Sequence, residues 1–164
     1  MARKVFYSFH YKPDSQRASK VRNMGRLEGN QPVSANRWEQ VKRSGDPAIR
    51  RWIQQQMRGK TCVVVLIGTD TASRRWVNYE IRQGWNSGLG VVGIRINKMT
   101  DLAGHTATRG ANPLSRTTLG NTSLDRIAKT YDPAGTSSAA VYRSIYRNID
   151  KWVEEAITIR ARHG

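Results

Sequence analysis

The sequence predicts an α/β fold, in which a mainly parallel sheet of five strands carries helices on both faces. Two segments, 61–67 and 91–96, are almost entirely apolar or β-branched, which is typical of parallel strands buried on both faces. Stretches with apolar residues at helical spacing separate and flank these segments. Such alternation implies parallel strands joined by right-handed helical crossovers. We expect residues 1–164 to form a single domain with one core.

The first part of the chain predicts a strand, a loop and a helix. Val5–Phe9 is a short apolar run led by β-forming residues, which favours a first strand. His10–Pro13 is expected to be a loop. Asp14 or Ser15 can then cap a helix that continues to about residue 26.

The next stretch is polar before it becomes helical. Residues 27–36 contain Gly, Asn and Pro, and we expect a loop around a short second strand at 32–34. Asp46 and Pro47 predict a helix start, with a carboxylate N-cap and proline in the first helical position. Gly59 ends this helix. Its apolar stripe, which we expect in the core, comprises Ile49, Trp52, Ile53 and Met57.

The strand at 61–67 leads through a turn, 68–70, into a predicted helix over about 72–86. Two further tryptophans, Trp85 and Trp152, lie on apolar stripes of this helix and of the last one, so we expect them in the core. After the strand at 91–96, residues 97–123 turn to Gly, Thr, Asn and Ser. They predict a long loop or insertion, a kind of segment that often carries function.

The chain is expected to end with an edge strand and a helix. Residues 127–131 predict the edge strand, and Ser137 or Ser138 can cap the terminal helix. The inward stripe of that helix is Val141, Ile145, Ile149, Trp152 and Val153. For five strands in this order, a flavodoxin-like arrangement is the natural expectation.

Composition argues against several classes of protein. The sequence contains no run of eighteen apolar residues, so we expect no membrane span. The N-terminus is too short and polar for a signal peptide. Cys62 lies alone in an apolar run, which predicts a buried thiol and a cytoplasmic protein. His10, His105 and His163 are far apart, so we expect no metal site.

The chain is strongly basic, with 28 Lys and Arg against 12 Asp and Glu and a net charge of +16. Such a field attracts nucleotides, nucleic acids or acidic protein surfaces. The basic residues are scattered, and no nucleic-acid-binding motif accompanies them. A solvated surface with generic attraction for polyanions is the favoured explanation, although nucleic-acid binding stays open.

Trp76 and Glu80 stand out because they follow a buried strand and lie four residues apart on one helix face. In open α/β sheets, ligands bind beyond the carboxyl ends of the strands. A single carboxylate beside an aromatic ring at that place suits a nucleotide sugar that bears positive charge. By spacing alone, the same pair is also what an ordinary amphipathic helix edge contains.

Several motifs together resemble the TIR-like domains of bacterial anti-phage Thoeris systems. They span roughly residues 3–113 and comprise Val5–Tyr11, Val21–Asn23, Val65–Gly68, Arg74–Ile81, Gly93–Asn97 and Asn112–Pro113. The resemblance implies a TIR fold. It also implies that the nicotinamide–ribose bond of NAD⁺ is cleaved, as by an NAD⁺ glycohydrolase or ADP-ribosyl cyclase, with NAD⁺ as substrate and no separate cofactor.

In TIR enzymes an essential glutamate lies in a Trp-x-x-x-Glu context, which the resemblance carries onto Trp76 and Glu80. It further implies sensing of a phage-derived trigger, self-association, and a cyclic ADP-ribose isomer or related messenger that activates a separate effector. In the pocket we expect Phe9, Tyr11 and Trp76 to offer stacking faces. His10 and Asn23 are expected to hydrogen-bond the substrate, and Arg74 or Arg75 to meet its pyrophosphate.

Two rival functions remain at this point. One is a catalytically silent TIR-like adaptor or nucleotide-binding module. The other is a nucleic-acid-binding domain, which the net charge of +16 motivates.

Overall fold

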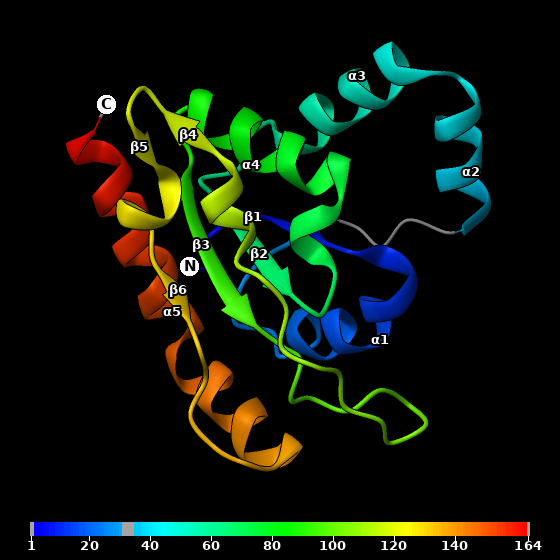
Figure 1. The fold of residues 1–164 in the computed structure, drawn as a ribbon, viewed down its shortest axis with the longest axis vertical. Coiled ribbons are helices and arrows are strands. Elements are labelled where there is room, and N and C mark those ends of the chain that lie inside the picture. Colours follow the sequence, from blue (N-terminus) through cyan, green and yellow to red (C-terminus); the bar gives the residue numbers. More distant parts are fainter. Residues whose placement is uncertain (1, 31–34, 164) are drawn as a thin grey trace.

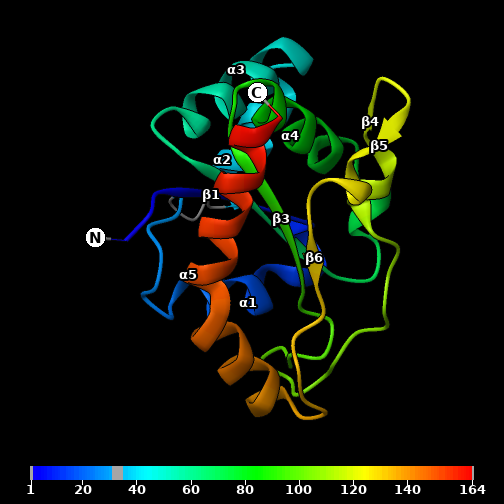
Figure 2. The same ribbon diagram turned by 90° about the vertical axis from the view of Figure 1, so that its left-hand side faces the viewer.

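The computed structural model describes residues 2–30 and 35–163, with the side chains of 35–38 left aside. A parallel four-stranded sheet of order β1-β2-β3-β6 forms its centre, with helices on both faces (Figures 1 and 2). The strands of this sheet are β1 (Val5–Phe9), β2 (Cys62–Ile67), β3 (Gly90–Arg95) and β6 (Thr130–Tyr131). The helices are α1 (Tyr11–Arg22), α2 (Ala35–Arg43), α3 (Asp46–Met57), α4 (Arg75–Asn86) and α5 (Ser138–Arg162).

Alternating side chains of the strands divide the core between the two faces of the sheet. Val5 and Tyr7 point to the face covered by α1 and α5, while Phe6 points to the face covered by α3 and α4. All six residues of β2 and all six of β3 are buried, as the β-branched composition of these segments predicts. The predicted stripes of α4 and α5, with Trp85 and Trp152, are buried as expected.

The expected count of five strands differs from the four in the described part of the sheet. The order of those four agrees with a flavodoxin-like sheet that lacks its second strand. The short strand predicted at 32–34 lies outside the described residues. Just before it, Glu28 forms a parallel bridge with Lys4, so the chain runs along the outer edge of β1.

Several predicted boundaries were wrong. Helix α1 begins at Tyr11, inside the expected loop, because its first turn accommodates Pro13 without needing a backbone donor there. It ends at Arg22 rather than near residue 26. Gly45 is the N-cap of α3, and the Asp46 carboxylate bonds to a side chain of α4 instead.

The C-terminal half also differs in detail. The edge strand β6 is only two residues long, while the expected cap at Ser137 is confirmed, since its side chain accepts a hydrogen bond from the Ala140 amide. The predicted 97–123 insertion contains a 3₁₀ helix, Pro113–Arg116, and a small hairpin of β4 (Thr118–Leu119) and β5 (Thr122–Ser123). Leu114 is completely buried beside α4, so the insertion contributes to the core.

Residues 97–110 cross the carboxyl ends of β2 and β3. The Thr69 hydroxyl donates to the Thr108 carbonyl oxygen at 2.8 Å, and Arg95 donates to the Gly110 carbonyl oxygen at 2.6 Å. A side chain at Gly110 would collide with the backbone that follows β2. The carboxyl end of β1 lies beside this covered region and forms part of a large pocket.

Candidate active site

The pocket at the carboxyl end of β1 has a volume of about 810 Å³. The end of β1 and the start of α1 form one side of it, and the start of α4 forms another. Side chains of α2 and α3 close it further. This is the edge of a parallel sheet at which ligands are expected.

Glu80 lies in this pocket on the second turn of α4, partly buried. The Ser8 hydroxyl of β1 donates a hydrogen bond to Glu80 Oε1 at 2.6 Å. Burial raises the pKa of the Glu80 carboxyl to about 8, and the bond from Ser8 opposes part of that rise. The free protein therefore holds a carboxyl group that is largely protonated at neutral pH and that a nearby positive charge would ionise.

Aromatic rings line much of the pocket. Phe9 and Tyr11 are stacked, with ring centroids 6.2 Å apart. Trp76 packs edge-on against Tyr79, with centroids 5.5 Å apart. Trp52 of α3 is half-buried and packs against the core, but it also lines the pocket, which the sequence did not predict. Planar surfaces of this kind suit a base or a nicotinamide ring.

The same pocket has a predominantly basic lining. Its cationic side chains are Lys12, Arg22, Lys42, Arg74 and Arg75. The Arg75 guanidinium lies 4.6 Å from the centroid of the Trp76 ring and forms an ion pair with Asp46. Arg22 donates to the Asn30 carbonyl oxygen, which fixes its guanidinium at the pocket. Several cations around one cavity favour an anionic ligand such as a diphosphate.

His10 is the N-cap of α1 and lines the pocket. Its pKa is lowered by burial first and by Arg74 second, against a smaller opposing effect of Asp70. The imidazole is therefore neutral at physiological pH and can donate or accept a hydrogen bond. Its Nδ1 is buried without a hydrogen-bond partner among the described residues.

The structure brings six of the seven residues proposed for the site into this one pocket: Phe9, His10, Tyr11, Arg75, Trp76 and Glu80. Asn23 is not among the lining residues. It is exposed at the far end of α1, where its amide closes the helix by bonding to the Ser19 carbonyl oxygen.

Sequence reasoning missed several residues of the site, and Ser8, Arg22, Lys42 and Trp52 are four of them. Arg22 and Lys42 looked like ordinary surface charges, and no local motif separates such cations from pocket cations. Trp52 flanks the buried series Ile49, Ile53 and Met57. Its place at the edge of that stripe was the available signal. Ser8 was a second available signal, because a hydroxyl within an otherwise apolar strand needs a hydrogen-bond partner.

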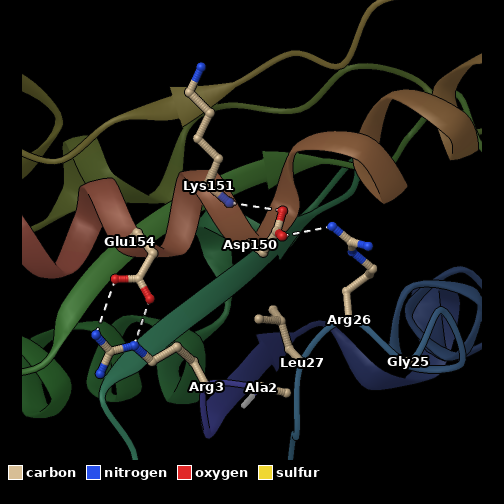
Figure 3. Close-up of a pocket in the computed structure, with 8 residues that line it drawn as sticks. All are labelled: Ala2, Arg3, Gly25, Arg26, Leu27, Asp150, Lys151 and Glu154. Carbon is tan, nitrogen blue, oxygen red and sulfur yellow. Dashed lines mark hydrogen bonds and ion pairs between the residues drawn. The ribbon is translucent and has the colours of Figure 1, made fainter.

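A second hollow, of about 470 Å³, lies at the opposite, amino-terminal end of β1 against α5 (Figure 3). Arg3 and Glu154 form a two-pronged ion pair there, and Arg26 pairs with Asp150 (Figure 3). Its opposite charges mostly satisfy each other, so it offers less to a ligand than the pocket around Glu80.

The described residues contain neither a candidate metal site nor a candidate membrane span. No group of three or more His, Cys, Asp or Glu side chains is placed to hold a metal ion. Nor does any described helix combine the length and apolar character needed to cross a bilayer.

Comparison with known proteins agrees with the fold. Residues 6–101, which include most of β1, all of α4 and Glu80, match the model of the TIR-like domain of Thoeris protein ThsB. The chain is 37% identical over 118 residues to a protein of Bacillus cereus (strain MSX-D12) named "Putative cyclic ADP-D-ribose synthase ThsB1". That match covers 69% of this chain and 62% of the relative, so the chain spans less than two thirds of the relative's length. With more than half of its residues matched by the family model, the chain belongs to the family of Thoeris ThsB TIR-like domains.

Proposed function

We propose that this protein cleaves NAD⁺ at the nicotinamide–ribose bond and converts the remainder into a cyclic ADP-ribose isomer or a related nucleotide. The observation that carries the proposal is Glu80, a carboxyl group held by Ser8 in a pocket with aromatic and cationic walls. The printed name of the Bacillus relative, a cyclic ADP-D-ribose synthase, supports the same reaction.

The reaction suits a single carboxylate. The bond between ribose C1′ and the nicotinamide nitrogen breaks, and both electrons leave with nicotinamide, which departs as a neutral molecule without needing a proton. The sugar is left with oxocarbenium character. A fixed carboxylate stabilises that developing positive charge. One such group typically contributes about 3 kcal/mol to lowering the barrier.

Substrate binding can prepare the Glu80 carboxylate. Burial raises the pKa of the Glu80 carboxyl to about 8, but the nicotinamide ring of NAD⁺ carries a positive charge. A cation close to the carboxyl group favours its ionised form. Binding of NAD⁺ therefore releases a proton and generates the charged group where the reaction needs it.

The walls of the pocket fit the rest of the molecule. Trp76 and the stacked pair Phe9 and Tyr11 provide faces for the two bases. Arg22 and Arg74 are suited to the diphosphate that links the two halves of the dinucleotide. For cyclisation, a nucleophilic atom of the same molecule attacks C1′, and the aromatic walls favour a folded substrate while excluding water.

Within a Thoeris system, the cyclic product acts as a messenger that activates a separate effector protein. Production of the messenger begins when the protein meets a phage-derived trigger. This role rests on the family and on the name of the relative, and NAD⁺ and the effector are the partners it predicts.

The deciding experiment compares NAD⁺ consumption and product mass for the wild type and Glu80→Gln, in phage-challenged cells as well as with purified protein. We expect Glu80→Gln to lower the rate about a hundredfold or more, because glutamine keeps the shape but not the charge. Glu28→Gln is the matched control, since Glu28 is exposed beside β1 and does not line the pocket. Equal rates for Glu80→Gln and wild type, with the fold retained, would refute the catalytic assignment and favour a silent adaptor.

A further inference from the structure

The hydrogen bond between Ser8 and Glu80 joins two elements that are 72 residues apart in the sequence. Ser8 lies in β1, paired in register with Val65 of β2, and only 1% of it is exposed. Its side chain points to the same face of the sheet as Phe6, toward α4. The hydroxyl is thus buried at the floor of the pocket, behind the carboxyl group.

A serine is an unusual choice for this position. The side chains that β1 and β2 place around it on that face, Phe6, Val63 and Val65, are all apolar. Burying a hydroxyl among them costs free energy unless the hydroxyl forms a hydrogen bond. The partner it finds is Glu80, so the placement of Ser8 serves this carboxyl group rather than the packing of the sheet.

We propose that Ser8 is a positioning residue for Glu80, which holds Oε1 against the rigid strand and leaves Oε2 directed to the substrate. The proposal deepens the function proposed above and rests on it. Ser8 itself touches no substrate, because it acts from behind the carboxyl group.

Two consequences separate this role from simple packing. A donor to Oε1 favours the ionised carboxylate, so loss of the hydroxyl raises the pKa of Glu80 further. Loss of the bond also lets the carboxyl group rotate, which weakens charge stabilisation in the transition state more than substrate binding. The other ionisable groups that line the pocket, whose titration must be separated from that of Glu80, are Tyr7, His10, Tyr11, Lys12, Arg22, Glu39, Lys42, Arg74 and Arg75.

The test uses full-length protein in four forms: wild type, Ser8→Ala, Ser8→Thr and Val65→Ala. Ser8→Thr keeps the hydroxyl. Val65→Ala is the control for a packing defect, because Val65 is the buried neighbour of Ser8 in the sheet and does not line the pocket. The titration of Glu80 is followed by NMR of its side-chain carboxyl carbon, assigned with Glu80→Gln, so this readout needs no catalytic activity.

We expect Ser8→Ala to raise the titration midpoint of Glu80 by roughly half a unit to one unit, the equivalent of one hydrogen bond. Ser8→Thr should restore the midpoint, and Val65→Ala should leave it unchanged. In assays of NAD⁺ consumption, Ser8→Ala should lower kcat about five- to tenfold near neutral pH with KM within about twofold. A midpoint that stays in place in Ser8→Ala, or that moves equally in Val65→Ala, overturns the proposal. If the midpoint shifts as expected but Glu80→Gln leaves NAD⁺ consumption intact, the proposed function fails and the positioning role stands.

Discussion

Glu80 combines two properties that ordinary surface carboxylates lack. It lies at the floor of a pocket, and its single described hydrogen-bond partner is a neutral hydroxyl rather than a cation. The five cations of the pocket lining are absent from the causes that shift its pKa, which are burial and Ser8. The pocket therefore holds a carboxyl group at its floor that is uncharged at neutral pH but can ionise. The permanently charged side chains lie elsewhere in the lining.

The raised pKa of Glu80 makes stability depend on pH. The folded protein holds this proton up to about pH 8, whereas the unfolded chain releases it near 4.5. The contribution of Glu80 to stability is therefore fully present below about pH 4.5 and is lost as pH rises through 8. Glu80→Gln removes this dependence, so it should be more stable than wild type above pH 8, by on the order of 2 kcal/mol.

Chemical denaturation at pH 5 and at pH 9 measures this difference directly. The gap in the free energy of unfolding between Glu80→Gln and wild type should widen from the lower to the higher pH. Glu28→Gln, an exposed carboxylate outside the pocket, should show no such widening. A constant gap for Glu80→Gln at both values would show that Glu80 titrates normally.

At the scale of residues, a sequence motif predicted which side chains lie together in one pocket. Glu80 and Trp76 share a helix face whose position after a buried strand is readable from local patterns, and six of seven proposed residues share the pocket. Asn23 does not line the pocket, because it lies exposed at the C-terminal end of α1. The edge of an apolar stripe shows only that Trp52 is partly exposed, and its place in the pocket depends on how α3 approaches β1. Arg22 likewise required knowledge of how the end of α1 approaches β1.

Among the elements, the carboxyl edge of the sheet is divided between a covered part and a pocket. The covering segment, 97–110, is attached to α1 by the buried guanidinium of Arg17. Arg17 donates to the carbonyl oxygens of Met99 at 2.8 Å and His105 at 2.7 Å, and to Asp14 Oδ1 at 3.2 Å. Arg17 therefore keeps the covering segment in place over β2 and β3 while the end of β1 lines the pocket.

Replacing Arg17 with methionine keeps much of the side-chain volume but removes all these bonds. Burial already raises the pKa of the Asp14 carboxyl, and Arg17 is the group that opposes this rise. We expect Arg17→Met to lower the free energy of unfolding by about 3 kcal/mol, since a buried ion pair is broken and two carbonyl oxygens lose their donor. Residues 99–105 should also become the first site of limited proteolysis.

The matched control is Lys20→Met, which removes the bond from Lys20 to the Thr100 carbonyl oxygen on the same segment. Lys20 is only partly buried, so this variant should lose less than about 1 kcal/mol. Equal effects of the two substitutions, measured by urea denaturation, would show that Arg17 has no special role in holding the segment.

The strands that are buried on both faces were the most predictable from the sequence. β2 and β3 are apolar on both faces, and their strand assignments were confirmed within a residue. The insertion was less readable, because Leu114 and Leu124 are isolated apolar residues in a polar stretch and only their tertiary contacts with the α4 side of the core order it. β6 was predicted too long, since two ladder residues suffice beside β3.

At the scale of the whole molecule, the net charge of +16 is the feature that motivates nucleic-acid binding as an alternative to dinucleotide binding in the pocket. Most carboxylates of the chain take part in ion pairs within the described residues, so the excess of Lys and Arg is left to set the long-range field. Such a field attracts every polyanion, whereas the pocket around Glu80 selects by shape, by stacking and by a few placed cations. Salt separates the two kinds of binding, because each phosphate contact with nucleic acid releases a counterion.

We therefore expect binding of a labelled 20-nucleotide single strand to weaken by roughly a hundredfold or more between 50 and 200 mM salt. Binding of ADP-ribose, which contains one diphosphate, should weaken by only a few fold over the same range, because few phosphate contacts are involved and stacking is not screened. Fluorescence anisotropy follows the first and calorimetry the second, with Trp76→Ala as the control that should weaken ADP-ribose binding and leave the nucleic acid unaffected. A strand that stays bound at 200 mM salt and is displaced by ADP-ribose would place nucleic acid in the pocket and overturn the assignment of that pocket to a dinucleotide.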